Sequence, residues 1–289
     1  MDKENQKKRK RKMQIKEALD LFLQEQKRRN NSKATLKYYR DSITYFSDYI
    51  SKDILKYTID DIFDYLNMLR NKGNNSNGVN TRYRALRAFF RWASEQGYCS
   101  NIFEGVKTPK GTRKAISILT NDEIRTLLSC VAGRNRLIVL LMLDCGLRRS
   151  EVCSLRCEDI FDNYFIVRGK GDKERIVPMS DYIKLPVQEQ LIKSRLQNQG
   201  VLIDVSENAI KLLFQKLKKI TGIKRLHAHL LRHTFATLYL VNGGDPISLQ
   251  HILGHESLEI TKVYLHLAQT YVFRAGNKYS PMMHLDEKK

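Results

Sequence analysis

An ordered series of phosphate-binding and nucleophilic residue types runs through the second half of this chain. Arg148 and Arg232 can each present forked donors to the non-bridging oxygens of a phosphate. Tyr264 offers a hydroxyl that can hold a phosphoryl group covalently. One lysine and two histidines suited to proton transfer or hydrogen bonding complete the series: Lys170, His229 and His255. This set favours cleavage of a phosphodiester without a metal ion.

The spacing within the series suggests a role for each histidine. His229 and Arg232 are three residues apart, so they share one face of a helix. His229 titrates near neutrality and is the candidate base or proton relay for the tyrosine. His233 is rotated by about 100° from Arg232 and is expected to hold local structure. His255 is expected to donate a hydrogen bond to the phosphate.

Two of these roles have competing candidates in the sequence. Lys170, between two glycines, is favoured as the acid that protonates a departing 5′ oxygen, and Lys173 is its rival. Tyr264 is favoured as the nucleophile because it follows His255 by nine residues in polar surroundings. Its alternatives are Tyr239, Tyr271 and Tyr279. The free hydroxyl has a pKa near 10, so its deprotonation must be assisted.

A metal-centred site finds little support in the sequence. His229 and His233, like His251 and His255, have the four-residue spacing of a helical zinc pair. No glutamate completes a metalloprotease motif, and no acidic cluster suits magnesium. Cys153 and Cys157 are expected four residues apart on one helix, as small buried residues. We therefore expect neither a metal nor another cofactor.

The composition points to a polyanionic partner. The 289 residues include 51 Lys and Arg against 31 Asp and Glu, a net charge of +20 with a pI near 9.7. Nucleic acid is the simplest partner for such a chain, and a solubilising surface is the alternative. A 42% hydrophobic content supports a proper core. No apolar run reaches membrane-spanning length and no signal peptide is visible, so we expect a cytoplasmic, nucleoid-associated protein.

The periodicity predicts a mainly α fold with a small β-hairpin in the second of two domains. A basic tail at 1–12 precedes a helical domain at 13–99, and a linker follows at 100–117. A second domain spans 118–271, and its period changes at 163–178, where a glycine-rich turn predicts the hairpin. A tail covers 272–289. Six basic residues of the helical domain and linker are candidate DNA contacts: Arg82, Arg84, Arg87, Arg91, Lys107 and Lys110.

The motifs together resemble those of the tyrosine recombinase (phage integrase) family, in its short two-domain Xer-like form. The matching segments are Gly146-Leu147-Arg148-Arg149-Ser150-Glu151, Gly169-Lys170-Gly171-Asp172-Lys173, His229-Leu230-Leu231-Arg232-His233, Leu253-Gly254-His255 and Tyr264. The resemblance implies a two-domain DNA clamp, with a helical, SAM-like core-binding domain and a catalytic domain. Its catalytic set falls on Arg148, Lys170, His229, Arg232, His255 and Tyr264. Glu151, Lys173 and His233 would support that set.

The resemblance also implies an activity and partners. The enzyme would be a site-specific DNA recombinase or integrase of a mobile element or chromosome, cutting and rejoining strands through a 3′-phosphotyrosine and a Holliday junction. Its partners would be double-stranded DNA with a specific site and a homotetramer, or a heterotetramer with a paralogue, in which residues 272–289 contact a neighbouring protomer. The alternatives are a type IB topoisomerase-like enzyme and a catalytically inactive DNA-binding regulator.

Overall fold

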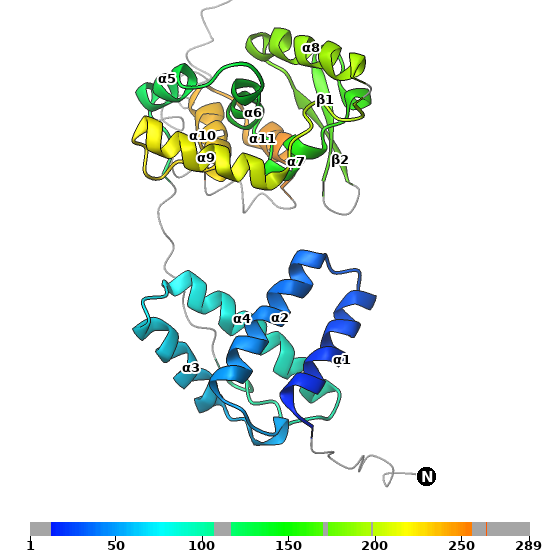
Figure 1. The fold of residues 1–289 in the computed structure, drawn as a ribbon, viewed down its shortest axis with the longest axis vertical. Coiled ribbons are helices and arrows are strands. Elements are labelled where there is room, and N and C mark those ends of the chain that lie inside the picture. The colour runs from blue at the N-terminus through cyan, green and yellow to red at the C-terminus, as the bar shows by residue number, and fades with distance from the viewer. Residues whose placement is uncertain (1–12, 107–116, 170–172, 198, 256–263, 265–289) are drawn as a thin grey trace, which may run out of the picture. The chain divides into compact units, whose positions relative to one another are not determined.

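Four helices form the first of two units in this computed structural model. Described residues are 13–106, 117–169, 173–197, 199–255 and 264, and the units divide between Lys114 and Ala115. The helices are α1 (Ile15–Arg28), α2 (Lys33–Tyr49), α3 (Ile59–Asn71) and α4 (Ser76–Glu95), with a short 3₁₀ turn at Ile54–Lys56 (Figure 1). Among the described residues, no helix combines the length and apolarity that a membrane crossing requires.

Capping side chains fix where these helices begin. Ser32 and Asn75 each accept a hydrogen bond from a backbone N–H in the first turn of the helix that follows. Thr58 and Asp61 form a reciprocal capping box at α3. The interior is aromatic, with Phe22 and Phe89 in edge-to-face contact at 5.6 Å between ring centroids. This unit is therefore held by its own local signals and its own core.

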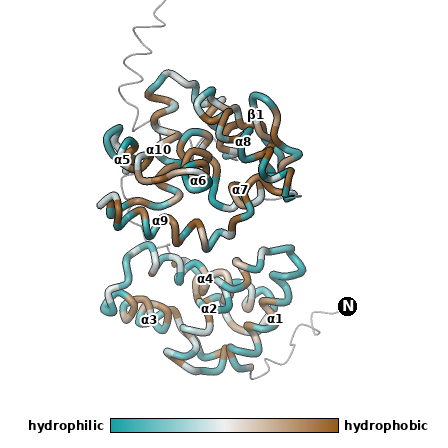
Figure 2. The backbone as a smooth tube through the Cα atoms, turned by 45° about the horizontal axis from the view of Figure 1, so that its top comes forward, coloured by the Kyte–Doolittle hydropathy of each residue, from teal (hydrophilic) through white to brown (hydrophobic). Residues whose placement is uncertain are grey.

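The second unit is also mainly helical. Its elements are α5 (Asn121–Ser129), α6 (Gly133–Leu143), α7 (Arg149–Ser154), a 3₁₀ turn (Cys157–Asp159), β1 (Tyr164–Arg168), β2 (Glu174–Pro178), α8 (Asp181–Leu196), α9 (Glu207–Thr221), α10 (Ala228–Val241) and α11 (Pro246–Leu253). Helix α6 is buried on most sides and packs against α7, α8 and α10. Apolar and polar residues alternate along α9 as the helix turns, so that one face of α9 packs on the core (Figure 2).

The predicted hairpin is present and is the one sheet of the described residues. Strands β1 and β2 pair antiparallel, from Tyr164 opposite Pro178 to Arg168 opposite Glu174. Phe165, Val167 and Val177 are buried on its inner face, and β2 contacts α11. The prediction of a mainly α fold with a small hairpin is confirmed.

The prediction that Cys153 and Cys157 share a helix is wrong. Helix α7 ends at Ser154, and Leu155 leaves it in an extended conformation, so Cys157 begins a separate 3₁₀ turn. Because α7 has only six residues, it ends before the second cysteine. Within the part of the chain that the structure describes, no group of three or more His, Cys, Asp or Glu side chains is arranged to hold a metal.

Candidate active site

A glycine turn between α6 and α7 places the first arginine. Gly146 has φ +65°, and a Cβ at this position would lie 2.5 Å from Phe235 Cδ1 and 2.9 Å from Leu253 Cδ2. A side chain is therefore excluded by both conformation and space. Leu147 then enters the core, and Arg148 becomes the N-cap residue of α7.

Glu151 is the acceptor around which the site is built. Its side chain is 5% exposed, and Arg148 donates to it twice, from backbone N to Oε2 at 2.7 Å and from Nη1 to Oε1 at 2.8 Å. Arg175 donates Nη1 to Oε1 at 2.9 Å and Nη2 to Oε2 at 2.8 Å. Burial would raise the pKa of Glu151, but the hydrogen bonds and charge of Arg175, followed by those of Arg148, lower it to about 2.

Arg175 is a residue to which the sequence analysis gave no role. It lies on β2 opposite Val167, two residues before Val177, and both valines are buried. Cross-strand partners and alternate residues share a face, so the hairpin pattern already placed an arginine toward the core. A buried arginine normally has a specific partner, and this was the available signal.

Arg232 is buried and joins the two glycine motifs. From α10 it donates Nη1 to the Gly146 carbonyl at 2.5 Å and Nη2 to the Leu253 carbonyl at 2.6 Å. Its Nη2 also lies 3.4 Å from Nε2 of His255, and its Nη1 lies 3.9 Å from Oε2 of Glu151. Burial, and then the charge of Arg148, lower the pKa of Arg232 to about 9, so it is still cationic at neutral pH.

The tyrosine meets a different histidine from the one expected. Tyr264 is 3% exposed, and its hydroxyl lies 2.8 Å from Nδ1 of His233. His229 is exposed, and its ring centroid lies 4.4 Å from that of His233. The two histidines are one helical turn apart, so both reach the same side of α10. His233 lies one turn further along α10 than His229, and Tyr264 belongs to an apolar cluster with Ala236 of α10 and Leu249 and Leu253 of α11.

The surroundings keep these histidines neutral. Desolvation, assisted by His229 for His233 and by Arg232 for His255, lowers the pKa of each to about 4. Desolvation and then Arg232 also lower the pKa of His229. Burial raises the pKa of Tyr264, although the charges of Arg232 and Arg148 oppose that rise. At neutral pH, therefore, the protonated hydroxyl of Tyr264 faces the neutral imidazole of His233, which has one unprotonated nitrogen that can accept a hydrogen bond.

Three of the predicted basic residues lie outside the described residues: Lys107, Lys110 and Lys170. The rival Lys173 is described and exposed, and its carbonyl accepts a hydrogen bond from Gly169 N at 2.8 Å. The two strands of the hairpin are thus in place on either side of Lys170.

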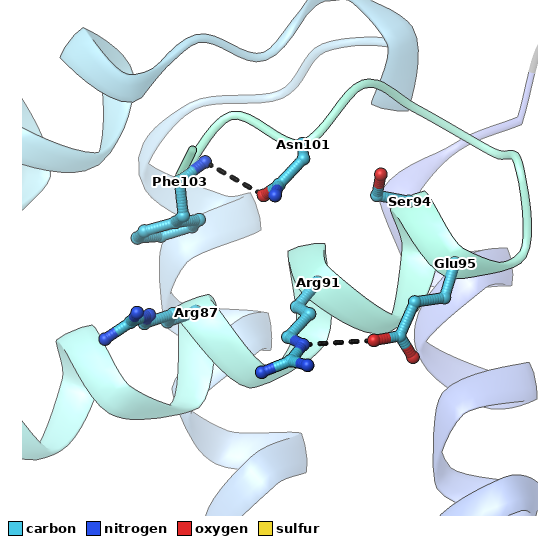
Figure 3. Close-up of a pocket in the computed structure, with 6 residues that line it drawn as sticks. All are labelled: Arg87, Arg91, Ser94, Glu95, Asn101 and Phe103. Carbon is cyan, nitrogen blue, oxygen red and sulfur yellow. Dashed lines mark hydrogen bonds and ion pairs between the residues drawn. The ribbon is translucent and has the colours of Figure 1, made fainter. Parts of the chain in front are cut away.

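The α4 arginines divide into two kinds. Arg84, Arg87 and Arg91 are exposed, and Arg91 pairs with Glu95 at 3.0 Å. Arg87 and Arg91, on successive turns of α4, both line one hollow of about 310 Å³ (Figure 3). Arg82 differs, because it donates Nη1 to Ser42 Oγ at 3.0 Å and lies 5.0 Å from the ring centroid of Tyr45. Its contacts are therefore made within its own unit.

Comparison with known proteins decides the family. A model of the phage integrase family matches residues 117–270, and a model of the phage integrase N-terminal SAM-like domain matches residues 19–100. The chain belongs to the phage integrase family. A tyrosine recombinase of Pseudothermotoga lettingae is 34% identical to this integrase, covering 78% of it and 83% of the relative. Tyrosine recombinase XerA of Saccharolobus solfataricus is 32% identical, covering 81% and 82%. XerC of Oceanobacillus iheyensis is 28% identical, covering 88% and 92%.

Solved structures agree on the fold. A lambda integrase dimer bound to a COC′ core site has a TM-score of 0.74 at 21% identity, covering 87% of this integrase and 95% of that chain. XerH bound to a palindromic difH substrate has a TM-score of 0.70 at 21% identity, covering 86% of this integrase. The family membership confirms the prediction of a tyrosine site-specific recombinase, an enzyme that breaks and rejoins DNA strands. A topoisomerase or an inactive regulator is not favoured.

Proposed function

We propose that Tyr264 is the nucleophile of this recombinase and that Arg148 and Arg232 bind the scissile phosphate. The tyrosine oxygen bonds to phosphorus while the bond to the 5′ oxygen breaks, which leaves a 3′-phosphotyrosine and a 5′ hydroxyl. The 5′ hydroxyl of a partner strand then reverses the step on the new strand. The convergence of two arginines with a buried tyrosine and its histidine in one unit supports this assignment. Charge that spreads over the phosphate oxygens in the transition state would meet preorganised donors.

The proton of Tyr264 passes to His233 in this proposal. The Nδ1 atom of His233 is already at hydrogen-bonding distance from the hydroxyl, and a lowered pKa keeps that ring neutral. His229 is exposed at the start of α10, where the charges of both Arg232 and Arg148 act on it. We assign His229 and His255 to the phosphate, as hydrogen-bonding partners beside the arginines.

The nucleophile is tested by trapping on a nicked suicide substrate that carries a recombination site. Tyr264→Phe removes only the hydroxyl, so it should retain DNA binding and form no covalent adduct, whereas the wild type should form one. Tyr239→Phe is the matched control, because Tyr239 lies on α10 and is the described rival. A covalent adduct with Tyr264→Phe, or its loss with Tyr239→Phe, would reject the assignment.

Lys170 is proposed as the acid that protonates the leaving 5′ oxygen, a contribution of typically 10²–10⁴-fold. A substrate with sulfur at the bridging 5′ position needs no proton, because a thiolate leaves readily. The sulfur substrate should therefore restore cleavage by Lys170→Ala. Lys173→Ala should be only mildly impaired on the ordinary substrate and should gain nothing from the sulfur substrate. The reverse pattern would transfer the role to Lys173.

Assembly on DNA completes the proposal. A lambda integrase tetramer bound to a Holliday junction has the same fold, with a TM-score of 0.72. We propose four protomers of this chain on two duplexes, with the site of action at the nucleoid. In this proposal residues 272–289 of one protomer contact the neighbouring protomer through apolar side chains that include Phe273, Met282 and Leu285.

An apolar groove of about 600 Å³ in the second unit is the proposed receptor for that tail. Its lining includes Leu128, Leu143, Met179, Phe235 and Tyr239. Deleting residues 272–289 should leave single-site binding intact and reduce the yield of junctions. Loss of thermal stability in the DNA-free monomer, with junction yield unchanged, would show instead that the tail folds back on its own unit.

A further inference from the structure

Arg175 uses three donors on two different elements of the second unit. Its Nη1 and Nη2 atoms bind both oxygens of Glu151, and its Nε donates to the Ile252 carbonyl at 2.7 Å. Its side chain is 10% exposed. The guanidinium therefore connects β2, the strand that follows Lys170, with the carboxylate beside Arg148 and with the end of α11.

The packing around Arg175 is close enough to require a glycine. Gly254 has φ +61°, and a Cβ there would lie 2.9 Å from Cδ of Arg175. The adjacent carbonyl, that of Leu253, is taken by Arg232. Two arginines thus hold the successive carbonyls of Ile252 and Leu253, directly before Gly254. The glycine that precedes His255 is explained by Arg175 as well as by its left-handed backbone.

The hydrogen bonds at Glu151 show what Arg175 does to Arg148. Each oxygen of Glu151 accepts one bond from Arg175 and one from Arg148, whose guanidinium contributes a single Nη1 bond to this carboxylate. The Arg148 side chain is 39% exposed. Without Arg175, Oε2 would lose its guanidinium donor, and Arg148 could close on the carboxylate with both Nη atoms.

The charges lead to the same conclusion. Arg148, Arg175 and Arg232 carry three positive charges against the single negative charge of Glu151, which leaves two for a phosphate. If Arg175 were absent, the balance would fall to one, and Glu151 would compete with the DNA for Arg148. The low pKa of Glu151, due largely to Arg175, keeps its carboxylate charged at all physiological pH values.

We propose that Arg175 is a positioning residue of the recombination reaction, which holds Glu151 so that the guanidinium of Arg148 stays available to the scissile phosphate. The proposal rests on the phosphate-binding role given above to Arg148. Arg175 acts through Glu151 and does not touch the DNA. A merely structural clamp would use the same contacts but would not depend on the charge of Glu151.

A charge-matched pair of variants separates these two roles. Arg175→Met should slow covalent adduct formation at saturating DNA by about 10²-fold, as a misplaced catalytic group does. The double variant Glu151→Gln with Arg175→Met restores a net charge of two and frees Arg148 from a carboxylate. It should form adducts at least tenfold faster than Arg175→Met. Arg175→Lys, which keeps the charge but loses the fork, should fall between wild type and Arg175→Met.

Arg168→Met is the matched control on the same hairpin. Arg168 pairs with Asp159 and Glu174 rather than with Glu151. Its variant should form adducts within about threefold of the wild-type rate, because the partners of Arg168 do not include Glu151 or Arg148. It removes the guanidinium that pairs with the buried Asp159, so its effect should fall on the melting temperature. The melting temperature of every variant is recorded, so that slow cleavage by an unfolded protein is recognised. If Arg175→Met unfolds, the double variant is compared with the wild type instead, because it leaves no buried carboxylate unpaired.

Each outcome decides the matter. Near wild-type cleavage by Arg175→Met, or a double variant no faster than the single one, would overturn the positioning role. If the wild-type protein itself forms no adduct, or Tyr264→Phe does, the proposed function fails and not this inference. A rescued double variant in the presence of a cleaving wild type supports both.

Discussion

An arginine of α4, Arg91, and an arginine of the second unit, Arg232, differ in burial and in the kind of partner that they bind. Arg91 on α4 is exposed and pairs with Glu95, four residues away on the same helix. Arg232 is buried, and its partners are the carbonyls of Gly146 and Leu253, which lie 86 and 21 residues away in the chain. Arg91 is thus presented to solvent, whereas Arg232 is part of the interior of the second unit.

This difference predicts that exposed and buried arginines contribute to different steps, DNA binding and strand cleavage. An exposed i,i+4 pair is worth only about 0.3–0.5 kcal/mol, so Arg91 can exchange Glu95 for a phosphate at little cost. A buried guanidinium has already been desolvated, and its fixed geometry can meet transition-state charge without reorganisation. We therefore expect variants of the first unit to change how tightly DNA is held, and variants of the second to change how fast it is cut.

The largest expected effect comes from removing one of the two arginines proposed to bind the scissile phosphate. Arg232→Ala and Arg148→Ala should each slow cleavage by about 10²–10³-fold at saturating DNA, as loss of a transition-state donor does. Arg232→Ala should also lower the melting temperature, and by more than Arg148→Ala, because it orphans two buried carbonyls, whereas Glu151 keeps Arg175 when Arg148 is lost. The measurements are single-turnover adduct formation and thermal unfolding. Cleavage near the wild-type rate by either variant would contradict its role.

Stability against acid should depend on the second unit through Glu151. The folded pKa of this carboxyl is about 2, below its unfolded value, so its contribution is present above about pH 4.5 and is lost as the pH falls toward 2. At 1.36 kcal/mol per pKa unit, this amounts to about 3 kcal/mol of the free energy of unfolding. Glu151→Gln should make the decline between those pH values shallower by that amount, as followed by urea unfolding.

Glu207→Gln is the control for the acid experiment. Glu207 also pairs with an arginine, Arg149, but its side chain is about half exposed. Its variant should keep the wild-type steepness between pH 4.5 and 2. An unchanged profile for Glu151→Gln would mean that Glu151 is not a low-pKa carboxylate in the folded protein.

Sequence patterns predicted those features that depend on neighbouring residues. The hairpin at 163–178 follows from local propensities, and the structure has it. The contact between His233 and Tyr264 joins residues 31 apart, and that between Arg175 and Glu151 joins residues 24 apart. Such contacts depend on how helices pack, which periodicity alone does not specify.

Arg82 teaches the same lesson within the first unit. Its spacing along α4 suggested a DNA contact equal to those of Arg84, Arg87 and Arg91. The structure turns it toward Ser42 on α2, 40 residues away, because it lies at the boundary between the helix faces. The position of an arginine around the axis of α4 therefore decides whether its side chain faces solvent or a neighbouring helix.

The smallest effect, and the one that sharpens the comparison most, concerns the exposed arginines of α4. Arg84→Ala with Arg91→Ala should weaken DNA binding and reduce the slope of log K against log salt by about 0.9 for each phosphate that the variant no longer neutralises. Cleavage of fully bound DNA should be unchanged, because the groups proposed to act on the scissile phosphate all belong to the second unit.

Arg82→Ala is the matched variant from the same helix. It should leave the salt slope at the wild-type value and lower the melting temperature of the first unit, since it removes a hydrogen bond to Ser42 and a cation–π contact with Tyr45. Binding measured over a range of salt concentrations, with thermal unfolding alongside, tests both. If Arg82→Ala reduces the salt slope while the double variant does not, the assignment of exposed and engaged arginines on α4 is reversed. If the double variant slows cleavage at saturating DNA, the separation of affinity from chemistry between the two units fails, because an exposed arginine of the first unit would then act in the transition state.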